Sequence, residues 1–339
     1  MISHTTKLTI YRNLAPSLLP ANYTITYRDS LDTVVATHIV TTPTGLLKWN
    51  GCKSYTYIDT IVFPNTGTYK VSTWDCCRDT VNNITNSTSY GMYIDCRIMV
   101  DGLNSSPYFL RDPIILAQKN LEFLYSIMPY DVDGDSLSWE LSNPEDLQNA
   151  GSGGFNIVSI PYTYPPSNSS APFRLDSMLG SILFTPNTEG RYQIGVKIIE
   201  WRNGAQIGYV KRDICLKLIQ SANVKAKARG LFTIYPNLIH IPWNQGTPTP
   251  TIYIEATQNF LFHLESYDST NFIGPYVYDY SFIYPNTIPH SSGGVTGVFF
   301  CDVFFNFYPT INDVSSNPYF ITFRVEDQFN NNNYIFLND

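Results

Sequence analysis

An internal repeat limits the folds open to this chain more than any other feature of its sequence. Three segments each carry a tyrosine at their third position, alternate apolar with polar residues and end at an acid; they are residues 67–75, 190–200 and 317–326. The terminal acids Asp75, Glu200 and Glu326 lie 125 and 126 residues apart. Such alternation is typical of half-buried β-strands, and the fixed period predicts three tandem domains of about 100–120 residues.

The tyrosine of each segment lies just ahead of a late strand of its domain. This is the place of the corner tyrosine of immunoglobulin-like sandwiches, whose hydroxyl ties the strand to the corner. Other alternating segments recur between Pro, Asn, Asp and Gly residues, and no amphipathic helix longer than about two turns is present. We therefore predict an all-β chain of tandem immunoglobulin-like β-sandwich domains, at residues 1–103, 104–222 and 223–339.

The composition excludes several classes of function. Charged residues make up 14% of the chain and the net charge is −7, whereas an average soluble domain is about 25% charged. The chain therefore offers no basic surface to nucleic acid, and its aromatic content of 15% is too high for a disordered protein. No apolar run of about 18 residues is present to span a membrane. An aromatic, charge-poor chain rich in Pro and Gly is typical of β-sandwiches that work outside the cytoplasm.

Four of the six cysteines, Cys52, Cys76, Cys77 and Cys96, lie in the first hundred residues. Zinc is normally held by two closely spaced cysteine pairs or by cysteines with nearby histidines, so this spacing predicts a disulfide framework instead. If Cys76 and Cys77 lie on a strand, their side chains point to opposite faces. The preferred pairing then joins one of them to Cys52 and the other to Cys96. The remaining two, Cys215 and Cys301, are either a buried pair of free thiols or a long-range bridge.

The N-terminal residues contain no apolar core of a secretory signal. Either the chain is intracellular, or this is a mature form whose signal has been removed. Disulfide-like cysteine usage and low charge favour the second, so we expect an extracellular or cell-surface location.

Six segments carry a family resemblance. In chain order they are Leu8-Thr-Ile-Tyr-Arg12, Trp74-Asp-Cys-Cys-Arg78, Asn104-Ser-Ser-Pro-Tyr-Phe109, Asp131-Val-Asp-Gly-Asp-Ser-Leu137, Ile182-Leu-Phe-Thr-Pro-Asn187 and Val196-Lys-Ile-Ile-Glu-Trp-Arg-Asn-Gly204. Over about residues 5–219 the chain resembles the large secreted surface proteins of Bacteroidota with PKD or cadherin-like repeats of the gliding-motility-associated type. The resemblance implies export with a cleaved signal and a C-terminal sorting domain, and a role as an adhesin or surface structure. The chain departs from it in lacking both export elements, and in having Asn13 in place of the usual cysteine and Val132 in place of a common proline.

The motif Asp131-x-Asp133-Gly134-Asp135 is the sharpest chemical signal in the sequence. Calcium takes six to eight oxygen ligands, and alternate aspartates around a turn glycine supply three or more of them. The resemblance to cadherin-like modules implies that such acids sit near an Asn-rich linker, where Asn104, Asp101 and Glu200 complete a cluster. We therefore predict structural Ca2+ held by Asp131, Asp133, Asp135, Asn104 and Glu200. The alternative is a simple turn between strands.

Catalytic motifs are not found in the sequence. The five histidines are scattered without a His-x-x-x-His pair, and no nucleophile elbow, P-loop or Gly-x-Gly-x-x-Gly motif is present. The chain is therefore expected not to be an enzyme.

A ladder of aromatic residues at period two marks the third domain, consisting of Tyr276, Tyr278, Tyr280, Phe282 and Tyr284. On a regular strand these rings share one face. If that face is exposed, it forms a binding surface for sugars or another protein; if it is buried, it forms an aromatic core.

The Bacteroidota resemblance also implies O-glycosylation where Asp-Ser or Asp-Thr precedes an apolar residue, at Ser30, Thr33, Thr60, Thr80, Ser136 and Ser177. Together these features predict a non-enzymatic extracellular structural or adhesive protein, such as a surface-layer or fibre subunit. Its expected partners are further copies of itself, surface proteins or glycans, with no nucleic acid. The alternative function is that of a carbohydrate-binding module.

Overall fold

The computed structural model describes most of the first 220 residues and shorter stretches of the remainder. The described residues are 2–13, 22–47, 52–109, 111–127, 129–151, 154–177, 180–220, 227–235, 239–242, 253–267, 279–283, 291–296, 301–314, 322–328 and 335–338. They form β-strands and two short 3-10 turns, η2 (Ser87–Ser89) and η3 (Ile311–Asp313). Within these residues, no helix has the length and apolarity needed to cross a membrane. The predicted all-β class is confirmed in the described residues.

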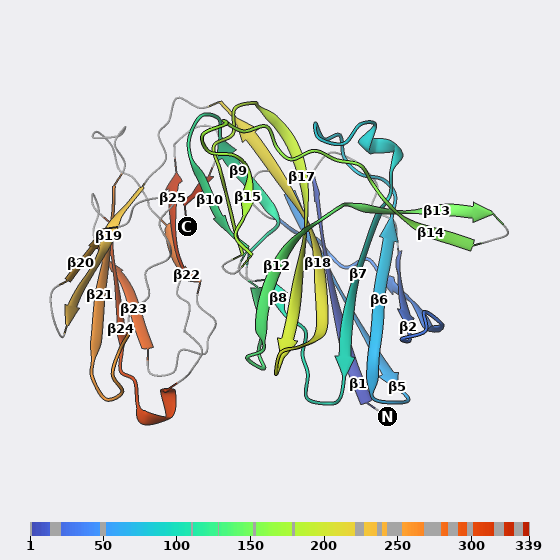
Figure 1. The fold of residues 1–339 in the computed structure, drawn as a ribbon, viewed down its shortest axis with the longest axis horizontal. Helices are drawn as coiled ribbons and strands as arrows, with labels where there is room; N and C mark the ends of the chain where they lie inside the picture. The colour runs from blue at the N-terminus through green and yellow to red at the C-terminus, as the bar shows by residue number, and fades with distance from the viewer. Residues whose placement is uncertain are drawn as a thin grey trace.

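One ten-stranded sheet runs through the first two predicted domains (Figure 1). Its main path, in spatial order, is β12 (Ser136–Ser142), β17 (Gly190–Arg202), β18 (Ala205–Ile219), β7 (Met92–Val100), β6 (Gly67–Asp75), β2 (Asn22–Arg28) and β3 (Val34–Thr41). The hairpin of β13 (Glu145–Gly151) and β14 (Gly154–Ser159) branches from β7, and β9 (Ile114–Gln118) runs parallel to β18. The two sandwiches meet where β7 pairs with β18, with Arg97 opposite Tyr209 and Cys96 opposite Val210.

Two smaller sheets pack on one face of this long sheet. The first consists of β1 (Ile2–Asn13), β5 (Cys52–Phe63) and β4 (Leu46–Leu47), and the second of β10 (Phe123–Ser126), β16 (Ser181–Phe184) and β15 (Arg174–Leu175). Strand alternation puts Cys96 on the same face of β7 as the core residue Ile98, and Val210 on the same face of β18 as the core residue Ile214. Because Cys96 and Val210 are paired, both cores lie on the same side of the sheet. The predicted boundary at residues 103 and 104 falls in the turn after β7, yet sheet hydrogen bonds continue across it.

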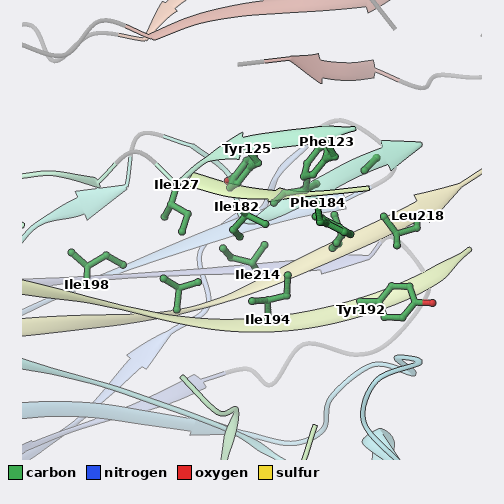
Figure 2. Close-up of a cluster of buried hydrophobic side chains, with 14 residues drawn as sticks. Phe123, Tyr125, Ile127, Ile182, Phe184, Tyr192, Ile194, Ile198, Ile214 and Leu218 are labelled. Atoms are coloured by element: carbon green, nitrogen blue, oxygen red, sulfur yellow. The ribbon is translucent and has the colours of Figure 1, made fainter. Parts of the chain in front are cut away.

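The core of the second sandwich is a dense apolar layer (Figure 2). Phe123 and Phe184 come from the small sheet and meet edge to face, with ring centroids 5.8 Å apart. Ile194 and Ile214 come from the long sheet and are completely buried. Burying such side chains stabilises the fold by about 1.5–3 kcal/mol each.

Corner tyrosines are present in both of these sandwiches, as predicted from the repeat. The hydroxyl of Tyr69 donates to the carbonyl of Asn65 at 3.0 Å, and that of Tyr192 donates to the carbonyl of Glu189 at 3.2 Å. Each bond ties the start of a strand to the preceding turn, because donor and acceptor lie only three or four residues apart. The tyrosine of the third segment, Tyr319, lies outside the described residues.

The preferred disulfide pairing of the sequence analysis is wrong. Cys76 and Cys77 are joined to each other, so neither bonds Cys52 or Cys96. The prediction assumed that both residues lie on a strand, but β6 ends at Asp75 and the alternation of side chains ends with it. Cys96 and Cys215 are free thiols. Burial raises the pKa of Cys96 to about 12 and that of Cys215 to about 11, so both stay protonated and unreactive.

The loop between β6 and β7 clamps the second sandwich. Its Arg78 donates to the carboxylate of Asp213 on β18 at 2.8 Å. Its Asn83 exchanges two hydrogen bonds with the backbone of Gln193 on β17, at 2.7 and 2.9 Å. A small apolar cluster of Val81, Ile84 and Ile160 seals the contact. The first two sandwiches therefore form one body.

Two further sheets occupy the third predicted domain. The first contains β20 (Ile239–Pro242), β19 (Lys227–Tyr235), β21 (Phe260–Tyr267), β24 (Cys301–Phe307) and β23 (Ser291–Thr296), and the second β22 (Asp279–Ile283), β25 (Thr322–Gln328) and β26 (Ile335–Asn338). Phe305 and Phe307 are buried, whereas Tyr308 is exposed. In the described residues, neither sheet is hydrogen-bonded to a strand of the first two sandwiches.

Candidate metal centre

The predicted aspartate motif forms a tight turn between β11 (Pro129–Tyr130) and β12. One carboxylate oxygen of Asp131 accepts the backbone N–H groups of Asp133 and Asp135, at 2.9 and 3.1 Å. Gly134 has a φ of +80°, a conformation that residues with a Cβ rarely adopt. The turn brings together the side chains of Asp131, Asp133 and Asp135, whose carboxylate oxygens lie within 4.8 Å of one another.

Glu200 adds a fully buried carboxylate beside this turn. It lies on β17, and both of its carboxylate oxygens are buried without accepting a hydrogen bond of normal geometry. The second carboxylate oxygen of Asp131 is buried and unsatisfied in the same way. Gly208 stands opposite Glu200 on β18, and a Cβ at that position would lie 2.7 Å from a Glu200 oxygen. The glycine therefore leaves room for the buried acid.

The electrostatics of the cluster favour a cation. Burial is the main cause that raises the pKa of Glu200 to about 7; the neighbouring Asp131 and Asp135 act in the same direction, and a hydrogen bond from Asn104 opposes them. Burial also raises the pKa of Asp131. A buried carboxylate without a counter-charge is costly, and a bound cation removes that cost.

Arg202 supplies part of the missing positive charge, although it was not among the site residues predicted from the sequence. Its guanidinium donates two bonds to the carboxylate of Asp135, at 2.8 and 2.6 Å. It also donates to Asn104 at 2.5 Å and contacts Asp101 at 3.4 Å. The bonds of Arg202 go to Asp135, Asn104 and Asp101, so the buried oxygens of Asp131 and Glu200 stay unneutralised. Its position two residues after Glu200 was the available signal.

The oxygen donors present fit calcium. Glu200 offers two buried oxygens, Asp131 offers one, and Asp133, Asp135 and Asn104 border the same space. Calcium accepts six to eight oxygens in flexible geometry, so a set dominated by carboxylates suits it better than nitrogen- or sulfur-seeking metals.

The other predicted site residues divide into two groups. All six predicted glycosylation residues, Ser30, Thr33, Thr60, Thr80, Ser136 and Ser177, are exposed. Of the aromatic ladder, Tyr276, Tyr278 and Tyr284 lie outside the described residues. Tyr280 is placed on β22 opposite Val325, but its side chain is not described.

One histidine–acid pair lies in the first sandwich. The ring of His38 is 2.8 Å from Asp59, whose same oxygen accepts the hydroxyl of Tyr27 at 2.7 Å. That hydroxyl in turn reaches Thr6 at 3.1 Å. These residues come from β3, β5, β2 and β1, so the network braces the small sheet against the long one.

Comparisons with known proteins return distant likenesses among the solved structures. No protein-family model and no curated protein matches the chain. A chain in the crystal structure of Dpr2 Ig1-Ig2 in complex with DIP-Theta Ig1-Ig3 is 10% identical, with a TM-score of 0.17, over 97% of this chain and 90% of that one. Extracellular cadherin domains 1–5 of protocadherin gamma B2 are 12% identical, with a TM-score of 0.21, over 96% of this chain and 53% of that one. Domains 1–6 of surface layer protein SbsC are 11% identical, with a TM-score of 0.17, over 96% of this chain and 51% of that one.

Proposed function

We propose that this chain is a non-enzymatic structural or adhesive protein of the extracellular space or cell surface, acting as a surface-layer or fibre subunit. The observation that carries the proposal is the union of two sandwiches by a shared sheet and a clamping loop. Force applied to such a body acts on hydrogen-bonded strands instead of a flexible joint, which suits a stalk or filament. Its partners are further copies of itself, surface proteins or glycans.

Surface glycosylation belongs to the same proposal. The support is that each of the six hydroxyl residues marked by the sequence is exposed, as a glycosyltransferase requires. Ser30 and Thr33 flank the turn before β3, and Ser136 begins β12 beside the metal centre.

Assembly is tested by negative-stain microscopy and light scattering of the native protein. Filaments or ordered arrays are expected as protein concentration rises, because a fibre subunit associates through repeated contacts between copies. A particle that stays monomeric at all concentrations and binds one sugar class on a glycan array contradicts the proposal. That outcome favours the carbohydrate-binding alternative.

We also propose that the metal centre holds structural calcium through Asp131, Asp133, Asp135, Asn104 and Glu200. The support is that Asp131 and Glu200 are buried acids with unsatisfied carboxylate oxygens, and that the less buried carboxylates of Asp133 and Asp135 lie beside Asp131. The cluster joins β17 to the turn before β12, so a bound ion stiffens the second sandwich near its junction with the first.

Calcium is expected to raise the melting temperature above that in excess chelator. A ligand bound only by the folded state adds about 2.7 kcal/mol at a hundred times its dissociation constant. Glu200→Gln should abolish most of this calcium-dependent rise, because it removes the fully buried charge. Differential scanning calorimetry measures the melting temperatures of the native protein and of this variant. Glu140→Gln, at a half-exposed position on β12, is the control and should keep the calcium-dependent rise. Identical melting of the native chain in calcium and in chelator contradicts the site.

A further inference from the structure

Three ionisable side chains meet where the two sandwiches join. Asp95 lies on β7, Lys211 on β18 and Glu145 at the start of β13. Asp95 and Lys211 are the next positions in register after the two residue pairs of β7 and β18, Arg97 with Tyr209 and Cys96 with Val210, so their side chains lie on the same side of the sheet. Glu145 reaches them because its backbone pairs with Tyr93, two residues before Asp95.

The contacts within this triad are close, and they differ in kind. The Nζ of Lys211 donates to a carboxylate oxygen of Glu145 at 2.6 Å. The same Nζ lies 2.7 Å from Oδ1 of Asp95, yet that oxygen accepts no hydrogen bond of normal geometry. The other oxygen, Oδ2, accepts the hydroxyl of Tyr209 at 3.0 Å. The amine is thus placed against the carboxyl group of Asp95 while Tyr209 polarises that group.

The surroundings exclude much of the solvent. The side chains of Lys211, Asp95 and Glu145 are 17%, 5% and 22% exposed. Burial lowers the pKa of Lys211, but Asp95 and Glu145 outweigh it and leave the pKa above its usual value. The resting form is therefore the ammonium, and a proton must leave before the nitrogen can act as a nucleophile. Glu145 is the hydrogen-bonded acceptor for that proton.

We propose that Lys211 and Asp95 condense to an intramolecular amide, a cross-link between the first and second sandwiches, with Glu145 as the proton carrier. The Nζ of Lys211 gives one proton to Glu145, and its lone pair attacks Cγ of the Asp95 carboxylate, making the C–N bond. As this bond forms, Oδ1 of Asp95, 2.7 Å from Nζ, takes a second proton from the nitrogen and becomes the hydroxyl of the tetrahedral intermediate. The hydroxyl of the tetrahedral intermediate takes a proton from Glu145 and leaves as water, breaking a C–O bond. In sum, an ammonium and a carboxylate become an amide and one water, with no oxidant or cofactor.

The amide would close the junction at the place where the pairing of β7 with β18 ends. It joins residues far apart in the chain, so unfolding either sandwich would leave the two strands attached. The proposal goes beyond the role as a fibre or surface subunit, since the bond forms within one chain whether or not copies assemble.

Intact-mass measurement of the reduced native protein tests the cross-link. The amide removes one water, so the expected mass is about 18 Da below the sequence mass. Proteolysis should then release one branched peptide joining the segment around Asp95 to the segment around Lys211. Lys211→Arg keeps the positive charge without an amine that can form the bond, and Glu145→Gln removes the proton carrier. Both variants are expected at their full sequence masses.

Lys197→Arg is the matched control. Lys197 donates to the carboxylate of Glu140 at 2.7 Å and lies 5.0 Å from the centroid of the Tyr209 ring, on the same sheet. Within the described residues no hydrogen bond or ion pair joins Lys197 to Asp95 or Glu145, so the variant should keep the mass deficit. Full sequence mass in the native protein overturns the proposal. A deficit of about 18 Da without a branched peptide also overturns it, because aspartate dehydration to a succinimide at Asp101-Gly102 or Asp133-Gly134 gives the same mass. Complete cross-linking in Glu145→Gln overturns the assigned role of Glu145.

Discussion

Replacing Arg78 with alanine is expected to lower the free energy of unfolding by about 3–5 kcal/mol, the usual cost of removing one partner of a buried ion pair. The Arg78 side chain is 1% exposed. Its two terminal nitrogens donate at 2.8 Å to the carboxylate of Asp213 and to the carbonyl of Glu145. The substitution removes both bonds and leaves Asp213 without its cation. It also releases the clamping loop, so both sandwiches should lose stability together.

Urea unfolding followed by tryptophan fluorescence measures this effect. Lys197→Ala is the control, because it breaks a more exposed ion pair on the same sheet and should cost at most about 1 kcal/mol. A single transition is expected for the first two sandwiches in the native protein. If Arg78→Ala unfolds no more easily than the control, the clamp contributes nothing to the junction.

Phe184→Ala is the second substitution with a large expected effect, again about 3–5 kcal/mol, because it opens a cavity in a close-packed core. Phe184 is 1% exposed and makes edge-to-face contacts with Phe123 and Phe173, at centroid distances of 5.8 and 5.2 Å. Phe123 is held on β10 beside Phe184 (Figure 2), so its ring has little freedom to fill the lost volume.

Thermal and urea unfolding of three variants separate cavity formation from a general loss of aromatic surface. Phe184→Leu keeps most of the volume and should cost less than Phe184→Ala. Tyr308→Ala removes a ring that is 52% exposed and should change stability by no more than about 0.5 kcal/mol. Equal losses for Phe184→Ala and Tyr308→Ala would show that the described core is not the stabilising layer.

The sequence was most informative where a residue acts on its near neighbours in the chain. Tyr69 and Tyr192 were found because a corner tyrosine bonds a carbonyl a few residues away. The turn of Asp131, Asp133 and Asp135 follows from its own glycine and aspartates. Glu200 and Asn104 lie beside this turn, as the sequence predicted. The binding of a calcium ion there stays a proposal.

Long-range contacts were the part that the sequence did not predict. The strands β7 and β18 pair at two residue positions. Nothing in the apolar pattern of either strand distinguishes an edge that will be covered by another strand from one that will face water. Arg202 was overlooked because its partners Asp101 and Asn104 are remote in sequence. The predicted cysteine pairing was wrong because it placed Cys76 and Cys77 on a strand, whereas β6 ends at Asp75.

The shared sheet also has a consequence for synthesis. Residue 211 leaves the ribosome 116 residues after residue 95, a delay on the order of ten seconds at typical translation rates. Until β18 arrives, the nascent first sandwich exposes the edge of β7, and an unpaired edge is a template for a strand from any neighbouring chain. Many copies emerge close together on a polysome. The arrival of β18, the last strand of the shared sheet to be made, therefore decides whether the edge of β7 pairs within its own chain or with a strand of a neighbouring chain.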